Sequence, residues 1–135
     1  MNEKPIAFTL IHAAHMIEEH LEEVLSEVGL SGAKFAALST LADTVEPLSL
    51  CDLAAKLSCV RSNVTQLVDR LEAEGLVRRV DDPKDRRGVR AEITALGQER
   101  QAAGAERVGK VHQALERQLG AIDTEKLERA LSAIT

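Results

Sequence analysis

The chain has 135 residues, enough for one domain or for two lobes sharing a core, and its net charge is −5. Its hydrophobic fraction of 44% and charged fraction of 29% are ordinary for a globular protein, and no apolar run approaches the ~20 residues that span a bilayer. The N-terminus lacks the features of a signal peptide, so we expect a cytoplasmic protein with reduced cysteines. With two Phe and no Trp or Tyr, the core must be aliphatic, a composition typical of packed helices.

The N-terminal third predicts two helices. Apolar residues at helical spacing predict a first helix from about Pro5 to Val28, ended by Gly29. It has more apolar surface than its own lobe can cover, so we expect a partner subunit, the C-terminal helices, or both, to pack on it. Ser31 can cap a second helix that continues through about Asp43.

Two shorter helices follow and resemble a helix-turn-helix, one from about Ser49 to Leu57 and one from about Arg61 to Glu74. The second has an apolar stripe, and polar side chains occupy its other face. Such side chains can pair with base edges or phosphates, although an ordinary solvated helix face is the alternative. The candidate DNA contacts on this helix are Arg61, Ser62, Asn63, Thr65, Gln66 and Arg70.

A cationic hairpin comes next, with strands from Leu76 to Val80 and from Val89 to Thr94 around a polar loop at residues 81–88. A structural hairpin needs turn residues but no cluster of cations, whereas a tip that enters a polyanion's groove needs them. The candidate DNA contacts in this loop are Lys84, Arg86 and Arg87. Residues 56–90 carry a net positive charge although the chain as a whole is acidic.

The C-terminal part predicts a long helix from Leu96 to about Leu119 and a last helix capped by Asp123. The long helix tolerates three glycines, which cost about 1 kcal/mol each against Ala and can mark a bend or close helix contacts. They are Gly97, Gly104 and Gly109.

The segment from Leu48 to Gly97 closely resembles the MarR family of bacterial winged helix-turn-helix transcription regulators. The resemblance rests on the motifs LAAKL, RSNVTQLVDRLEAEGLV, DPKDRRG and ITALG, in this order. It implies a mainly α fold with a small β-hairpin wing, a DNA-binding domain at residues 31–94, and dimerisation helices at residues 1–30 and 95–135. It also implies a homodimer that places helix 61–74 in the major groove and wing 81–88 in the adjacent minor groove of a pseudo-palindromic operator.

Individual residues match the family's motifs. Arg87 matches the wing-tip arginine that the family inserts into the minor groove, and Asp85 matches the acidic residue that orders the wing. Asp69 matches a helix aspartate that can pair with a wing arginine. The chain departs from the family at Val60, where a serine is common, and at Gln66, where a basic residue is frequent.

The residues leave the signal open between three classes. Oxidation sensing would use Cys51 or Cys59, with a buried structural thiol as the alternative for Cys59. A transition metal would need ligands on the first and the long C-terminal helix, although solvated histidines are the alternative; the candidates are His12, His15, Glu19 and His112. An organic effector could instead lie between the first, second and long C-terminal helices; its candidate walls are Phe8, His12, Met16 and Phe35.

The chain shows no phosphate loop, no nucleophile–base spacing and no paired-carboxylate site, so we predict neither an enzyme nor a cofactor. The functional prediction is a homodimeric repressor that binds double-stranded operator DNA, has no membrane contact, and is released by a small-molecule, metal or oxidant signal. The alternative is a winged-helix protein-interaction module that does not bind DNA. The acidic balance and Val60 favour the alternative slightly, whereas the wing cations count against it.

Overall fold

The computed structural model describes residues 5–58 and 61–134, apart from the side chains at positions 61, 62 and 85–87. These residues form a mainly helical structure with a small sheet, as the sequence predicts. None of the helices in these ranges is both long and apolar enough to cross a membrane. The described elements in chain order are α1 (Ile6–Ser26), α2 (Gly32–Ala42), β1 (Leu48–Ser49), α3 (Leu50–Leu57), α4 (Arg61–Ala73), β2 (Val77–Asp82), β3 (Asp85–Ile93), α5 (Ala95–Leu119) and α6 (Thr124–Ser132).

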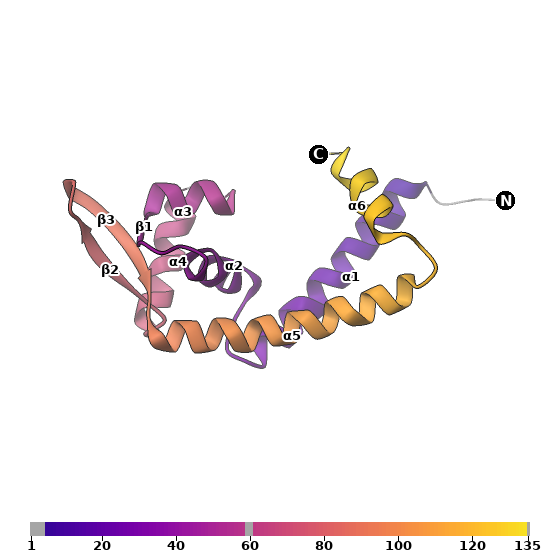
Figure 1. Ribbon diagram of the computed structural model, residues 1–135, viewed down its shortest axis with the longest axis horizontal. Coiled ribbons are helices and arrows are strands. Elements are labelled where there is room, and N and C mark those ends of the chain that lie inside the picture. The colour runs from indigo at the N-terminus through magenta and orange to yellow at the C-terminus, as the bar shows by residue number, and fades with distance from the viewer. Residues whose placement is uncertain (1–4, 59–60, 135) are drawn as a thin grey trace.

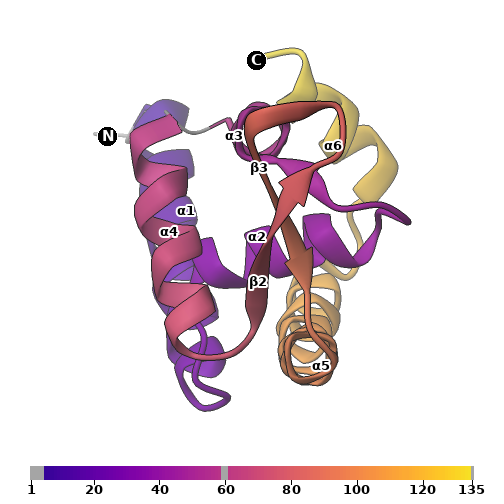
Figure 2. The same ribbon diagram turned by 90° about the vertical axis from the view of Figure 1, so that its left-hand side faces the viewer.

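The molecule is elongated, and α5 runs along most of its length (Figure 1). The N-terminal end of α5 adjoins a lobe made of α2, α3, α4 and the sheet. At the other end, α1 and α6 rise from the same side of α5 (Figure 1). Viewed along the long axis, α1 and α6 lie apart from one another (Figure 2). The helix α6 therefore leaves the N-terminal half of α1 uncovered.

The helix boundaries follow local capping chemistry. The Ser31 hydroxyl accepts a hydrogen bond from Lys34 N at 3.2 Å, and Ser49 Oγ accepts one from Asp52 N at 3.1 Å. These bonds satisfy backbone N–H groups that have no partner within a helix's first turn. After the C-terminus of α1, Gly29 (φ 74°) adopts the left-handed conformation that favours glycine.

The hairpin differs from its prediction. The strands extend to Asp82 and Asp85, so the connecting turn is Pro83–Lys84 rather than the whole of residues 81–88. The turn is short because Asp82 Oδ1 accepts a hydrogen bond from Lys84 N at 2.9 Å, and because proline's fixed φ suits the first central position of a turn.

The sheet has the order β1-β3-β2 among the described residues, and its strands are antiparallel. Strand β1 was not predicted, since two residues are too few to show a period. It pairs Leu48 with Ala91, and this pairing attaches the wing's base to the segment before α3. The register of β2 on β3 places Val77 opposite Ile93.

The core is aliphatic, as the composition predicts, and lies between α2, α3, α4 and the sheet. Phe35 is half-buried and packs against this core beside α5. There, a Cβ at Gly104 would lie 2.9 Å from the Phe35 ring, so the glycine permits the close approach. The largest fully buried side chains are Leu25, Leu38, Leu53, Leu71, Leu76, Val64, Val68 and Val77.

Candidate nucleic-acid interface

The helix α4 has one buried and one exposed face. Val64, Val68 and Leu71 are fully buried beneath it, and Leu67 packs at the edge of the same core. These apolar side chains fix the rotation of α4 about its axis, because turning the helix would expose them to water. The predicted readers Asn63, Gln66 and Arg70 are exposed on the other face, whereas Thr65 is half-buried. The side chains of Arg61 and Ser62 lie outside the described part of the chain.

The β2–β3 hairpin stands next to α4 at one end of the molecule, so the polar face and the wing are presented together (Figure 2). Lys84, at the turn, is exposed. Arg86 and Arg87 follow the turn at the start of β3, together with Asp85. Their side chains lie outside the described part, so their predicted roles stay predictions.

One arginine joins the β2–β3 hairpin to α4. Arg79 on β2 donates from Nη2 to Asp69 Oδ1 at 2.5 Å and from Nη1 to Glu72 Oε1 at 2.8 Å. Its backbone N also donates to Glu72 Oε2 at 3.1 Å. Burial disfavours the charged guanidinium, but the bonds to Asp69 and Glu72 outweigh that effect and raise the pKa of Arg79. Asp69, expected to pair with a wing arginine, therefore pairs at the base of the wing.

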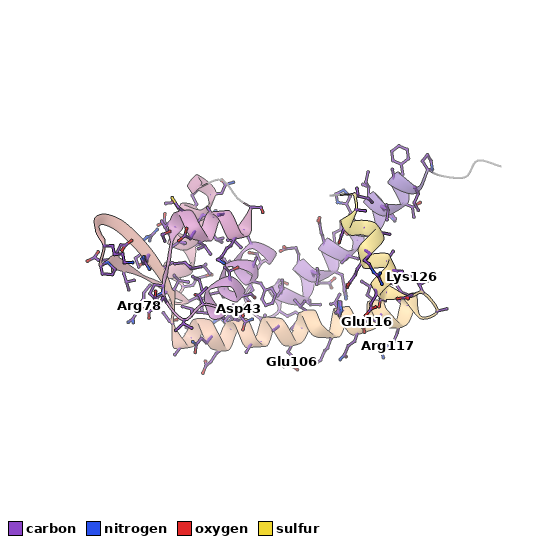
Figure 3. The ribbon with its side chains drawn as sticks, turned by 45° about the horizontal axis from the view of Figure 1, so that its top comes forward. Asp43, Arg78, Glu106, Glu116, Arg117 and Lys126 are labelled. Carbon is purple, nitrogen blue, oxygen red and sulfur yellow. The ribbon has the colours of Figure 1, made fainter. Side chains whose placement is uncertain are left out.

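The sequence reasoning missed Arg79 as a connecting residue. The spacing of Asp69 and Glu72 could have indicated it, because residues at i and i+3 share one face of α4 and can bind the same cation. The neighbouring Arg78 has a different role, since its Nε lies 2.8 Å from Glu92 Oε2 across the hairpin. Arg78 extends from the base of the wing, and Figure 3 labels it.

A second connection holds the turn of the wing. Asp82 Oδ2 lies 3.2 Å from Arg90 Nε, and Arg90 Nη1 donates to Pro47 O at 3.2 Å. The Nε contact lacks the alignment of a hydrogen bond, so it is an ion pair rather than a directed bond. The backbone bond from Lys84, followed by the contact with Arg90, lowers the pKa of Asp82. Asp82 thus orders the turn of the wing, and the ordering role expected for Asp85 stays a prediction.

The candidate effector walls are not brought together in one chain. Phe8 and Met16 on the N-terminal half of α1 are 63% and 53% accessible as whole residues, and His12 is exposed between them. Phe35 instead lines a hollow between α1, α2 and α5, with none of the other three.

The candidate metal ligands and the candidate redox cysteines are not gathered into a site in the described part of one chain either. Within residues 5–58 and 61–134 of one chain, no three His, Cys, Asp or Glu side chains are arranged to hold a metal ion. His12, His15 and Glu19 are exposed on α1, and His112 Nε2 lies 3.3 Å from Glu116 on α5. Cys51 is an exposed thiol near the start of α3. Cys59 and Val60 lie outside the described residues.

A helix-turn-helix whose second helix exposes a polar face beside a β-hairpin defines a winged helix-turn-helix protein. The MarR family model matches residues 30–89. The multiple antibiotic resistance protein MarR of Escherichia coli is 30% identical over 129 residues, which cover 93% of this chain and 88% of that protein. The chain belongs to the MarR family.

Two further comparisons agree. The HTH-type transcriptional regulator YkoM of Bacillus subtilis is 37% identical over 83 residues, which cover 62% of this chain but 53% of YkoM. The match thus spans about half the length of that relative. The structure of an Escherichia coli MarR mutant complexed with operator DNA superposes with a TM-score of 0.83 at 29% identity, covering 93% of this chain and 91% of that one.

Proposed function

We propose that this protein is a transcription regulator that binds operator DNA as a homodimer and acts as a cytoplasmic repressor. The observation that carries the proposal is the exposed polar face of α4, which lies beside a hairpin with cationic residues at its tip. The ion pairs of Arg79 support it as well, because they neutralise carboxylates on the same helix. An uncompensated carboxylate there would repel DNA phosphates.

The proposed docking uses both parts of this end of the molecule. Asn63, Gln66 and Arg70 on α4 enter the major groove, where Asn and Gln can pair with adenine and Arg with guanine. The wing enters the adjacent minor groove, with Arg87 inserted and Lys84 near the phosphates. The structure of the MarR mutant with operator DNA supports this docking by analogy.

Exposed apolar side chains support the proposed dimer. Ile6, Phe8 and Ile11 on α1 are 71%, 63% and 53% accessible, and Ile122 and Ile134 near α6 are 55% and 71% accessible. A helix that is apolar on most of its circumference is normally buried, so a second copy is the natural cover. Such a dimer would contact two half-sites one helical turn apart, about 34–36 Å.

The wing is tested by gel-shift titrations of Arg87→Ala across a range of salt concentrations. We expect a loss of at most a few kcal/mol in binding and a salt slope smaller by about one unit. Arg117→Ala is the matched control, because it removes the same charge from an exposed site at the far end of α5. Wild-type behaviour of Arg87→Ala would contradict the wing's role. Failure of the wild type to bind random duplex DNA at low salt would favour a protein-interaction module instead.

The dimer is tested by sedimentation of Ile11→Asp. A charge at this position would have to be desolvated in the interface, so we expect dissociation to monomers at micromolar concentration. Val45→Asp is the control, because Val45 is fully exposed in the loop after α2. A wild-type protein that sediments as a monomer would contradict the proposal.

A further inference from the structure

The exposed face of α4 carries two side-chain amides near its N-terminal end. Asn63 and Gln66 are both exposed, on a helix that extends over Arg61–Ala73. The buried Val64 and Val68 hold the opposite face against the core, so both amides are directed away from it. Within the described part of the chain, neither amide has a hydrogen-bond partner. Each amide therefore has an NH2 donor and a carbonyl acceptor available for a ligand.

The carboxylates on and just after α4 are held by cations, so they do not dominate this face. Asp69 and Glu72 pair with Arg79, and Glu74 Oε1 lies 2.9 Å from Lys34 Nζ. A free aspartate can accept a hydrogen bond from the N4 amino group of cytosine, but the bond from Arg79 competes with that contact. The face therefore offers neutral amides, rather than free carboxylates, for reading bases.

Adenine is the base whose major-groove edge matches a primary amide. It presents N7 as an acceptor and the N6 amino group as a donor, so the amide NH2 and carbonyl can bond it at the same time. Guanine presents two acceptors, N7 and O6, and leaves the amide carbonyl without a donor. Thymine offers one acceptor beside a methyl group and cytosine offers one donor, so neither makes the paired contact. An amide therefore selects adenine, by about tenfold over a wrong base.

The spacing of the two amides matches neighbouring base pairs. Asn63 and Gln66 are three residues apart, which corresponds to about 4.5 Å along the axis of an α-helix. Successive base pairs are about 3.4 Å apart, so the amides reach adjacent pairs rather than pairs two steps apart. In a helix-turn-helix the N-terminal residues of the second helix contact the base edges, and both amides lie in the first half of α4. The two amides are therefore placed to read consecutive bases.

We propose that Asn63 and Gln66 select adenine at two adjacent base pairs in each half-site of the operator. Gln66 is the specificity-determining residue for one of these pairs, and Asn63 is that residue for the other. The inference rests on the proposed binding of operator DNA as a homodimer, and it adds the bases that the protein selects.

The base preference is tested by selecting bound sequences from a randomised duplex library, with the folding of each variant checked by circular dichroism. We expect the wild type to select two adjacent adenines in each half-site. Gln66→Ala should select one adenine and no base at the neighbouring position, whereas Gln66→Arg should select guanine there, because arginine bonds guanine N7 and O6. Gln118→Arg is the matched control, since it adds the same charge at an exposed position near the far end of α5, and it should select the wild-type sequence.

A change on the DNA side tests the same contact without altering the protein. Replacing a selected adenine with 7-deazaadenine removes the N7 acceptor but keeps the N6 amino group and the base pairing. At the position read by Gln66, we expect the affinity of the wild type to fall by about fivefold or more, because the amide NH2 loses its acceptor. The affinity of Gln66→Ala should change by less than about twofold, since that variant makes no contact with N7. Fluorescence anisotropy measures both affinities.

Several results would overturn the proposal: a wild type that selects no adjacent adenines, a Gln66→Ala variant that still selects both, a Gln66→Arg variant with the wild-type preference, or equal losses with 7-deazaadenine in the wild type and in Gln66→Ala. A wild type that binds no duplex DNA would refute the proposed function and this inference with it. A wild type that binds duplex DNA without the adenine preference would refute the base selection alone.

Discussion

Replacing Arg79 with methionine removes the cation that connects the wing to α4 while keeping most of the apolar stem. The Arg79 side chain is 25% accessible, and its partners Asp69 and Glu72 are 60% and 42% accessible. Exposed ion pairs contribute about 0.2–1 kcal/mol each, so the two pairs together should contribute about 1 kcal/mol to the free energy of unfolding. The backbone bond from position 79 to Glu72 remains in the variant.

The expected effect on DNA binding is larger than the effect on stability. The substitution leaves Asp69 as an uncompensated anion on the exposed face of α4 that we propose faces DNA. A unit charge about 7 Å from a phosphate costs about 0.6 kcal/mol even in a water-like dielectric. Loss of the side-chain bond from Arg79 Nη1 to Glu72 Oε1 adds to this effect, because the backbone bond alone holds the wing less firmly on α4. We therefore expect affinity for duplex DNA to fall roughly tenfold, which corresponds to about 1.4 kcal/mol.

Fluorescence anisotropy with labelled duplex DNA, together with urea denaturation, measures both quantities. Asp69→Asn introduced into Arg79→Met should restore part of the affinity, because it removes the uncompensated charge. Arg78→Met is the matched control, since Arg78 is 65% accessible and pairs within the hairpin rather than with α4. DNA binding within twofold of wild type in Arg79→Met, or no recovery on adding Asp69→Asn, would refute the reasoning.

Other predictions concern the body of the protein and the turn of the wing. Gly97→Ala should lower the free energy of unfolding by about 1–3 kcal/mol, because the new Cβ would collide with Leu76 O. Gly109→Ala has open space around it and should raise the free energy of unfolding by up to about 1 kcal/mol. Thermal melts compare the two variants. Leu38→Ala, at a fully buried position, should cost about 2–5 kcal/mol in urea denaturation. The pKa of Asp82 is lowered, so its contribution to stability is present above its ordinary pKa of 3.8 and is lost as pH falls through the lower folded value. An NMR carboxyl titration in which Asp82 titrates at or above 3.8 would contradict this assignment.

The sequence predicted the helices well because their boundaries depend on local chemistry. Ser31, Ser49 and Asp123 each cap the helix that was expected to follow, and Gly29 and Gly75 end helices with positive φ. A side chain that bonds a backbone N–H two or three residues away depends on few distant contacts. Such signals can be recognised from a single sequence.

The wing was predicted less accurately because its extent depends on pairing between strands. Asp81 and Asp82 favour turns as individual residues, yet they lie in β2 because β3 supplies backbone partners opposite them. The ion pairs of Arg79 and Arg90 join segments whose proximity depends on the tertiary fold, so composition and periodicity did not reveal them. The effector candidates on α1 were grouped by helical spacing, although Phe35 lies elsewhere.

The attachment of α5 to the DNA-binding lobe has a mechanical consequence. Thr94 Oγ1 donates to Gly75 O at 2.7 Å and accepts from Gly97 N at 3.0 Å, while Thr94 N donates to Leu76 O at 3.1 Å. These bonds fix the end of α4, the end of β3 and the start of α5 to one another. The 25 residues of α5 form a rod about 37 Å long. A tilt of such a rod by about 5° at one end displaces its other end by about 3 Å. A small tilt of α5 at the end near α1 and α6 would therefore shift α4 by about the spacing of one base pair.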